Sequence, residues 1–190
     1  KEISKQEKKF DSIEKFINND ICFIAGSSWE ADNDIFLKSI LESGNLKTII
    51  APHNVIASDI ENLEKKTQSL SVRYSRIDQD LDSSKKILII DSIGSLKHLY
   101  KFADIAYIGG GMGDSGLHNI LEAAVFAIPV IIGKNYKGFA EAEKLVKLGG
   151  VKSVNSKIEF DDIFNNLISD KTDRIKMGEI NKKYIYSNSG

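Results

Sequence analysis

Residues 104–132 read DIAYIGGGMGDSGLHNILEAAVFAIPVII, and this stretch decides the fold. It opens and closes on short apolar runs, at residues 104–108 and 129–132. Between them lie a glycine-rich loop and a segment with helical periodicity, predicted as a helix from about Leu117 to Ala127. Two apolar strands joined through a helix are typical of neighbouring strands in a parallel sheet.

The rest of the chain repeats this alternation. Further strands are predicted at residues 20–25, 47–51, 71–75 (an edge strand), 86–91 and 151–154. Helices are predicted at residues 31–43, about 55–70, 96–102 and 139–148, and at both ends of the chain. Strands that are apolar on both faces imply a sheet covered by helices on both sides. We therefore expect an α/β fold with a doubly wound, Rossmann-like parallel sheet, as a single domain over residues 1–190 with a helical tail from about residue 173.

Composition sets limits on function. Hydrophobic residues make up 42% and charged residues 28% of the 190 residues, as in ordinary globular proteins. The formal net charge of -1 gives no electrostatic reason to expect nucleic acid or an anionic membrane as partner. The lone cysteine, Cys22, excludes an internal disulfide and is expected to be buried. No run approaches the roughly 18 apolar residues of a membrane span, and the missing initiating Met favours a domain cut from a longer protein.

Polar and glycine-rich segments follow four of the predicted strands. They are Gly26–Trp29, Pro52–Asn54, Asp91–Gly94 and Gly109–Gly116. Because ligands of doubly wound sheets bind at the carboxyl ends of the strands, all four are expected to open onto one binding edge.

The loop at residues 109–116 has five glycines in eight residues. Glycine lets the backbone approach a ligand closely, and a helix amino terminus after such a loop favours a phosphate or carboxylate. No Gly-Lys-Ser/Thr follows, so this is not a Walker loop, and its late position in the chain argues against a dinucleotide fingerprint. The alternative is a turn needed only for packing.

Three positions after the glycines are candidate ligand contacts. Asn119 and Glu122 share a helix face in the prediction, and Glu122 could accept hydrogen bonds from two ribose hydroxyls. It could equally be an ordinary acid of a first helical turn. His118 could cap the helix or contact a phosphate. Similarly, Ser27 and Ser28 could bind a phosphate or a sugar acid, although by spacing alone a helix cap is favoured.

Other polar residues indicate no metal or acid–base site. The three histidines His53, His98 and His118 lack the spacing of zinc ligands, and His98 is expected on a solvated helix face. The acidic pairs Asp32/Asp34 and Asp161/Asp162 are interpreted as helix-start charges.

The stretch from Leu88 to Gly150 resembles the carboxyl-terminal domain of the Kdo (3-deoxy-D-manno-octulosonic acid) transferases. The matching segments are Asp91–Gly94 with Leu96 and Leu99-Tyr100, Ala103–Gly110, Gly116-Leu-His-Asn-Ile-Leu-Glu122, Pro129–Gly133, Phe139 and Leu148–Gly150. Gly26-Ser27-Ser28-Trp29 resembles the Gly-Ser-Thr-Trp turn of that family, so that the similarity extends over residues 21–150.

The resemblance implies one half of a GT-B glycosyltransferase, in which two Rossmann-like domains enclose the active site. This half would bind the donor substrate, CMP-Kdo, without a cofactor or a metal. An amino-terminal acceptor domain, absent from this chain, would supply the catalytic carboxylate, so this fragment alone should bind donor without transferring sugar. The acceptor would be a lipid A precursor of lipopolysaccharide biosynthesis at the cytoplasmic face of the bacterial inner membrane. The domain itself is expected to be cytosolic, with membrane association only through the full-length protein.

The resemblance also assigns roles to residues. Glu122 and Asn119 would hold the cytidine ribose and neighbouring polar groups, and the amides of Gly110, Gly111 and the helix start would face the phosphate. Ile93 and Gly94 would lie near the base. The full set of predicted donor contacts is Ser27, Ser28, Pro52, His53, Ile93, Gly94, Gly110, Gly111, Gly116, His118, Asn119 and Glu122. The family commonly has Pro-Arg-His after the second strand, whereas this chain has Ala51-Pro52-His53. Lys134 or Lys137 could replace the missing arginine.

Two alternatives remain open. A GT-B transferase or sugar-nucleotide epimerase that uses a UDP-sugar would place a ribose-binding glutamate on a comparable helix. A non-catalytic α/β module of receiver type would need an acidic cluster after the first strand, where Gly26-Ser27-Ser28 stands. The amphipathic amino-terminal helix, with Phe10, Ile13, Phe16 and Ile17, is expected to pack across the junction with the other domain.

Overall fold

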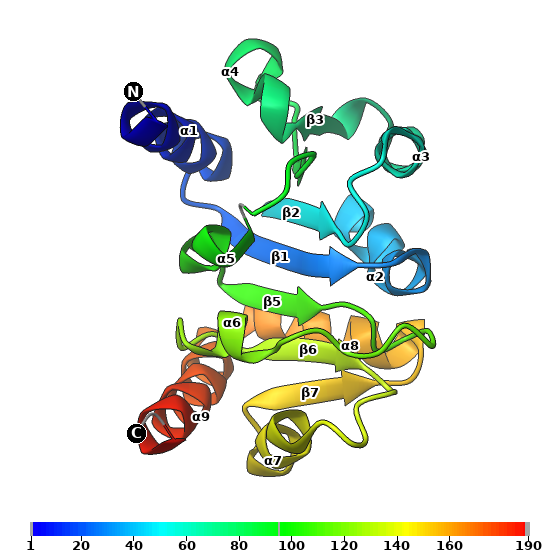
Figure 1. The fold of residues 1–190 in the computed structure, drawn as a ribbon, viewed down its shortest axis with the longest axis vertical. Coiled ribbons are helices and arrows are strands. Elements are labelled where there is room, and N and C mark those ends of the chain that lie inside the picture. Colours follow the sequence, from blue (N-terminus) through cyan, green and yellow to red (C-terminus); the bar gives the residue numbers. More distant parts are fainter. Residues whose placement is uncertain (1, 95, 189–190) are drawn as a thin grey trace.

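The structure, a computed structural model, describes residues 2–94 and 96–188, with side chains of the first helix from Phe10 onward. Over this part of the chain it forms one sheet of seven strands (Figure 1). The strands are β1 (Ile21–Ser28), β2 (Leu46–Pro52), β3 (Ser71–Arg73), β4 (Ile87–Ile89), β5 (Ile105–Ile108), β6 (Val130–Gly133) and β7 (Val151–Val154). Their order is β3-β4-β2-β1-β5-β6-β7 and all neighbours are parallel. The predicted doubly wound sheet is confirmed, including the edge position of β3.

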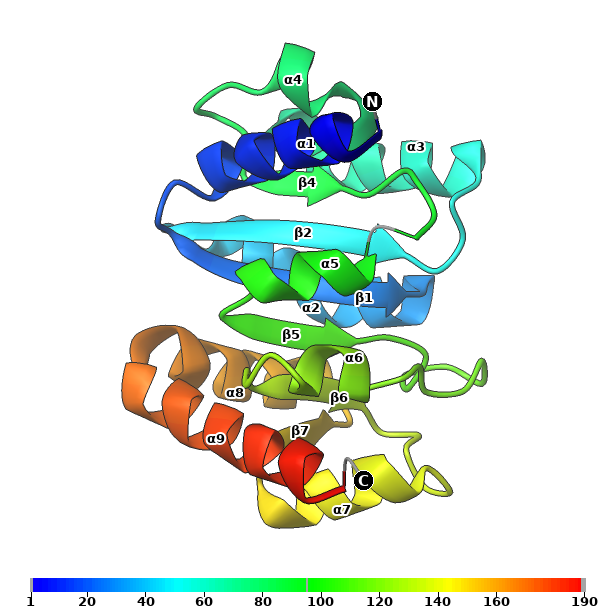
Figure 2. The same ribbon diagram turned by 60° about the vertical axis from the view of Figure 1, so that its left-hand side comes forward.

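Helices cover both faces of the sheet. They are α1 (Glu2–Ile17), α2 (Glu30–Glu42), α3 (Ala57–Thr67), α4 (Ile77–Asp80), α5 (Leu96–Leu99), α6 (Leu121–Ala124), α7 (Ala140–Leu148), α8 (Lys157–Ser169) and α9 (Lys171–Asn188), with short 3-10 turns η1 (Gln68–Leu70), η2 (Tyr74–Arg76) and η3 (Tyr100–Phe102). In Figures 1 and 2, α1, α5 and α6 lie on one face and α2 and α8 on the other. From β1 the chain winds toward β3, and from β5 toward β7. The carboxyl ends of β1 and β5 therefore frame the switch point, where ligands of such sheets bind.

Two hydrophobic clusters hold these layers together, one on each face. Cys22 and Ile24 of β1 belong to the first cluster, and Phe23 and Ala25 to the second. This alternation follows from the two-residue period of a strand. In the second cluster, the ring of Phe23 makes edge-on contacts with the rings of Phe36, Phe160 and Phe164, at centroid distances of 5.1 to 6.2 Å. Cys22 is buried in the core, as predicted.

The amino-terminal helix α1 packs on the domain's own core. Ile13 and Phe16 are 0% and 1% exposed, and both belong to the first cluster. The ring of Phe10 lies 5.9 Å from the ring of Phe102, at the end of α5 and η3. The prediction that this apolar face packs across a domain junction is therefore wrong, because the sheet of the same chain already buries it.

The carboxyl-terminal helix α9 is also anchored to its own domain. The side-chain amide of Asn181, which is fully buried, donates to the carbonyls of Ile128 and Gly150 at 2.7 and 2.9 Å. A Cβ atom at Gly178 would lie 2.0 Å from the carbonyl oxygen of Ala127, so glycine permits the close approach of helix and turn. The predicted helical tail is present, and its last two residues, 189 and 190, lie outside the described residues. No helix in the described part of the chain is long and apolar enough to cross a bilayer.

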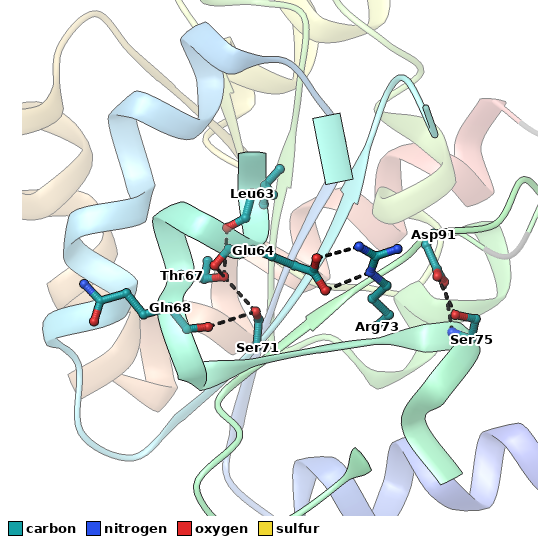
Figure 3. Close-up of polar contacts among 8 residues, drawn as sticks. All are labelled: Leu63, Glu64, Thr67, Gln68, Ser71, Arg73, Ser75 and Asp91. Carbon is teal, nitrogen blue, oxygen red and sulfur yellow. Dashed lines mark hydrogen bonds and ion pairs between the residues drawn. The ribbon is translucent and has the colours of Figure 1, made fainter. Parts of the chain in front are cut away.

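Polar contacts fix the edge strand β3 to its neighbours, as Figure 3 shows. Arg73 donates two hydrogen bonds to Glu64 of α3, at 2.7 and 2.6 Å, in a bidentate pair. Asp91, after β4, accepts hydrogen bonds from the amide and hydroxyl of Ser75 at 2.9 and 2.5 Å. Thr67 donates to Ser71 at 2.8 Å. A strand of three residues with one partner strand has few ladder bonds, and these side chains add to them.

Apart from shifted ends of several strands and helices, the predicted elements differ from the structure mainly in three places. Strand β1 extends through Ser28, where a bulge shifts the register against β2. The turn η2 and helix α4 were not predicted. The helix after the glycine loop begins at Leu121, four residues later than predicted, and ends at Ala124. Its early part is absent because the amide of His118 donates to the carbonyl of Gly109 at 3.1 Å, and Asn119 Oδ1 accepts from the amide of Leu121 at 3.1 Å.

Candidate functional site

The loops after β1 and β5 are in direct backbone contact at the switch point. The amide of Gly109 donates to the carbonyl of Gly26 at 2.9 Å. Ser27 adopts a left-handed φ of 51°, within the β1 bulge. A Cβ atom at Gly109 would lie 2.3 Å from the carbonyl oxygen of Ser27, which is closer than Cβ contacts occur. Glycine at position 109 is thus a condition for this contact between the two loops.

A buried carboxylate, Asp32 of α2, holds the glycine loop in place. Asp32 is 0% exposed, and Oδ2 accepts from the amides of Trp29 and Gly110 at 2.9 and 2.8 Å. Oδ1 accepts from the hydroxyl of Tyr107 at 2.8 Å and from the amide of Met112 at 3.3 Å. Burial, together with the charge of Asp32, raises the pKa of the Tyr107 phenol, which therefore stays a donor. One side chain thus joins the end of β1, strand β5 and the glycine loop.

The interpretation of Asp32 as a simple helix-start charge was incomplete. It does occupy the third position of α2 and accepts from the amide of Trp29, as a helix-start acid does. Only the folded chain brings Tyr107 and Gly110 onto it, from more than seventy residues away. For Asp34 the interpretation is wrong, since Asp34 lies beyond the first turn of α2, where it is exposed to solvent and pairs with Lys66 at 3.3 Å. Asp161 and Asp162 also lie beyond the first turn of their helix, α8, in which Asp161 pairs with Lys157.

The bond to Asp32 also changes one predicted contact. Gly110 was expected to direct its amide toward the phosphate, but that amide is already bonded to Asp32. Gly110 instead serves as a turn, with a left-handed φ of 90°. A Cβ atom there would lie 2.0 Å from the carbonyl oxygen of Gly116, so the loop folds tightly back on itself. The contribution of Gly111 and Gly116 to phosphate binding stays a prediction.

Three aromatic side chains from three loops contact one another across the site, and we call them the ring stack: Trp29, His53 and His118. The rings of Trp29 and His53 lie 4.2 Å apart at 20°, and those of His53 and His118 lie 4.6 Å apart at 34°. Trp29 Nε1 donates a long hydrogen bond, 3.4 Å, to His118 Nε2. The amide of His53 donates to the carbonyl of Ser28 at 2.9 Å, which ties the β2 loop to the end of β1.

The surroundings of His118 favour its neutral form. Its pKa is lowered by partial burial and, second, by the neighbouring His53, while the carboxylates of Asp32 and Glu122 act in the opposite direction. A neutral imidazole can accept the Trp29 hydrogen bond through Nε2, and a protonated one cannot. The lowered pKa and the hydrogen bond therefore favour the same state.

Glu122 lies at the outer side of the site. Its side chain is exposed, and no other described residue donates a hydrogen bond or forms an ion pair with its carboxylate. Its charge nevertheless acts on His118 and on the buried Tyr100. Asn119 precedes helix α6, so the two residues do not share a helical face as predicted. Asn119 is also exposed, and its side-chain oxygen caps Leu121.

The loop after β4 presents an apolar side chain to solvent. Ile93 is 91% exposed, and Gly94 has a left-handed φ of 88°. Asp91 is turned toward Ser75 and thereby fixes the start of this loop (Figure 3). His98 on α5 is exposed, as predicted.

The loop after β6 is bonded to the glycine loop. The amide of Asn135 donates to the carbonyl of Gly111 at 2.8 Å, and its side-chain amide donates to the carbonyl of Gly113 at 2.9 Å. These bonds place the exposed Lys134 and Lys137 around a shallow hollow beside Gly113 and Gly116. The two lysines thus flank the glycine loop.

Two cavities lie near the ring stack. One, of about 330 Å³, is lined by His118, Asn119, Phe139 and the start of α7. The other, of about 250 Å³, is lined by Ser28, Trp29, Asn33, Pro52 and residues of α3. Of the predicted contacts, His118 and Asn119 line the first cavity and Ser28 and Pro52 line the second, whereas the others, including Glu122, Ile93 and Gly94, line neither. Within residues 2–94 and 96–188, no group of three or more His, Cys, Asp or Glu side chains could hold a metal ion.

The chain is similar in sequence to known glycosyltransferases. No family model matches the chain. It is 29% identical over 191 residues to a 3-deoxy-D-manno-octulosonic acid transferase of Haemophilus influenzae, covering 96% of this chain and 44% of the relative. It is 32% identical over 145 residues to a bifunctional glycosyltransferase/methyltransferase of Fusobacterium nucleatum, covering 72% of this chain and 23% of the relative. The chain thus spans less than half the length of these curated relatives.

A solved structure with a similar fold is the C-terminal CMP-Kdo binding domain of WaaA from Acinetobacter baumannii. The TM-score is 0.81 at 16% sequence identity, and the match covers 94% of this chain and 96% of that one. At this identity the likeness concerns the fold alone, a Rossmann-like α/β domain.

Proposed function

We propose, on the premise that this chain is homologous to the 3-deoxy-D-manno-octulosonic acid transferases, that it binds the donor CMP-Kdo in a glycosyltransferase of lipopolysaccharide biosynthesis. One observation supports this most directly. The loops after β1, β2 and β5 meet at the switch point of the sheet, and Glu122 stands beside them with an exposed carboxylate that no described residue engages.

Glu122 suits the ribose of a nucleotide. A carboxylate has two acceptor oxygens and can take hydrogen bonds from the 2′- and 3′-hydroxyls together. Charge-assisted hydrogen bonds of this kind are stronger than neutral ones. Asn119 and His118 line the adjacent cavity and would contact neighbouring polar groups.

The phosphate would lie near Ser27, Ser28 and the glycine loop. Lys134 and Lys137 flank that loop and would supply the positive charge for which related transferases commonly use arginine. The exposed side chain of Ile93, next to Gly94, would pack against the cytosine base. Binding a flat base there would remove apolar surface from water.

The acceptor would be a lipid A precursor, bound with the help of a second domain that also supplies the catalytic carboxylate. In that arrangement this chain positions the donor and does not itself carry out the transfer. The reaction would take place at the cytoplasmic face of the bacterial inner membrane.

Calorimetric titration of the chain with CMP, UMP and UDP tests the donor assignment, with Glu122→Ala in parallel. We expect saturable binding of CMP, in preference to both uridine nucleotides, and weaker binding by about 10- to 100-fold in the variant, because hydrogen bonds to a charged group contribute roughly 1.5–3 kcal/mol. Glu42→Ala, an exposed acid at the far end of α2, is the control and should leave CMP binding unchanged.

Preference for UDP would move the assignment to a transferase or epimerase that uses a UDP-sugar. No binding of any nucleotide would favour a non-catalytic α/β module. If wild type and Glu122→Ala bind CMP with equal affinity, only the role of Glu122 in ribose binding would be contradicted.

A further inference from the structure

The cavity between helices α2 and α3, on the Trp29 side of the ring stack, contains two buried polar atoms without a partner. They are Oγ of Ser28 and Oδ1 of Asn33. The residues are 2% and 6% exposed, and both line the cavity of about 250 Å³. Among the described residues, neither atom has a hydrogen-bond partner.

Such atoms are costly unless a ligand or water satisfies them. A buried polar group without a partner destabilises a fold by about 1–3 kcal/mol, and most buried polar groups are paired. The cost applies to both atoms, and the two residues line the same cavity. A single water needs only roughly 10–15 Å³ of such a cavity, so there is room for a considerably larger group.

The lining indicates which chemistry the cavity accepts. Oδ1 of Asn33 is an acceptor and therefore requires a donor, such as a hydroxyl. The side chains of Asn54 and Asn62 add two amides to the lining of the cavity, and Asp59 adds a carboxylate. Amides and carboxylates together pair well with neighbouring hydroxyl groups.

The cavity is unsuited to a phosphate. Of the described residues that line it, Lys66 is the only cation. Its ammonium is already paired with Glu30 at 3.0 Å and with Asp34 at 3.3 Å. An anion entering there would also meet the charge of Asp59. A neutral, hydroxyl-bearing group would meet no such repulsion.

The position of the cavity relates it to the donor site. Trp29 forms part of its wall, and the same indole donates to His118, which lines the cavity on the nucleotide side. Ser28 belongs both to this cavity and to the predicted phosphate contacts. A sugar attached to a phosphate at Ser28 would thus be adjacent to the cavity mouth.

We infer that the cavity between α2 and α3 binds the hydroxyl-bearing part of the donor sugar, across the ring stack from the nucleotide, with the carboxylate of the sugar outside the cavity. This inference rests on the proposed function, because it takes the sugar to be that of the nucleotide-sugar donor. It assigns Asn33 and Asn62 to recognition of the sugar, whereas Glu122 recognises the nucleotide.

The test compares three ligands: CMP, freshly prepared CMP-Kdo, and free Kdo. Wild type should bind CMP-Kdo about tenfold or more tightly than CMP, which corresponds to one or two additional hydrogen bonds. Asn33→Leu, similar in size but without the acceptor, should remove this difference and leave the affinity for CMP unchanged. The exposed Asn62→Ala should reduce the difference without affecting folding. Asn165→Ala, an exposed asparagine of α8, is the matched control and should change neither affinity.

Thermal melting provides an independent measurement. Removing a buried polar group that has no partner within the protein should leave the melting temperature of Asn33→Leu unchanged or raise it. A purely structural role of Asn33 would instead lower it.

Equal affinities for CMP and CMP-Kdo in wild type, or a difference that persists in Asn33→Leu and Asn62→Ala, would overturn the sugar site while leaving the proposed nucleotide function intact. If CMP does not bind, the proposed function fails and free Kdo decides the sugar site. If wild type binds free Kdo and Asn33→Leu does not, the cavity is supported as the sugar site. If wild type does not bind free Kdo either, both the sugar site and the proposed function are overturned.

Discussion

Two parts of the site differ in how they are held. The buried junction, formed by Asp32, Tyr107, Gly109 and Gly110, is bonded within the protein at nearly every polar group described above. The exposed rim, formed by Ile93, Glu122 and Lys134, extends into solvent. The junction fixes the backbone of the loops before any ligand arrives, and the rim supplies groups that are free to contact one. Substitutions in the junction should therefore cost stability, and those in the rim should cost binding.

The largest effect on stability is expected for Asp32→Ala. The change leaves the amide of Gly110 and the hydroxyl of Tyr107, among other donors, without their acceptor, at about 1–3 kcal/mol for each buried group. We expect a loss of about 3 kcal/mol or more in the free energy of unfolding, or roughly 6–12 °C in melting temperature. Urea denaturation and thermal melting measure both quantities.

Asp34→Ala is the matched control, two residues along the same helix. Its carboxylate is 65% exposed and its ion pair with Lys66 should contribute no more than about 1 kcal/mol. Equal losses in the two variants would contradict a special contribution of the buried junction to stability.

A smaller loss is expected for Gly109→Ala. The added Cβ would meet the carbonyl oxygen of Ser27 at 2.3 Å, so the two loops must separate. Overpacking of this kind typically costs about 1–3 kcal/mol. Gly44→Ala provides the comparison, because a Cβ there meets no atom within 4 Å. Chemical denaturation of both variants is the measurement, and an unchanged Gly109→Ala would argue against the close contact of the loops.

Acidification should disturb the ring stack with a modest effect on stability. The folded pKa of His118 lies below its ordinary value of about 6.5, so folding favours the neutral form. Its contribution is complete above about pH 6.5 and is lost as the pH falls from there through the folded pKa. Since His118 is partly exposed, we expect an effect below about 1 kcal/mol.

Trp29 reports on this change because it is the only tryptophan of the chain. Its fluorescence should shift on acidification in wild type and in His98→Gln, in which an exposed histidine of α5 is replaced. His118→Gln should lack the shift. A transition that survives in His118→Gln would assign it to another group.

The smallest effect is expected at the edge strand. Glu64 and Arg73 form a bidentate pair with side chains 33% and 23% exposed, whereas Lys38 and Glu42 of α2 are 69% and 65% exposed at 3.7 Å. Double-mutant cycles should give a coupling energy of about 0.5–1 kcal/mol for the first pair and less than about 0.5 kcal/mol for the second. A larger coupling in the α2 pair would show that burial and bidentate geometry do not determine the strength.

The alternation of apolar runs and helical periodicity was sufficient to predict the sheet. Runs such as residues 105–108 and 130–132 are buried on both faces, and local sequence therefore reports the strands directly. The helix after the glycine loop was predicted too long. Its start depends on bonds from His118 to Gly109 and from Leu121 to Asn119, and the first of these needs the folded loop.

The sequence by itself thus determined the parallel α/β sheet, the edge at which its loops open, and the resemblance that the relatives support. Only the tertiary structure decided the partners of polar groups far apart in the chain. Asp32 binds Tyr107 and Gly110, the ring of His53 contacts those of Trp29 and His118, and Ser28 and Asn33 line one cavity. The physical reason is that apolar periodicity is a local property of the chain. A hydrogen bond or a ring contact depends on distances of a few ångströms, which only the packing of the whole domain fixes.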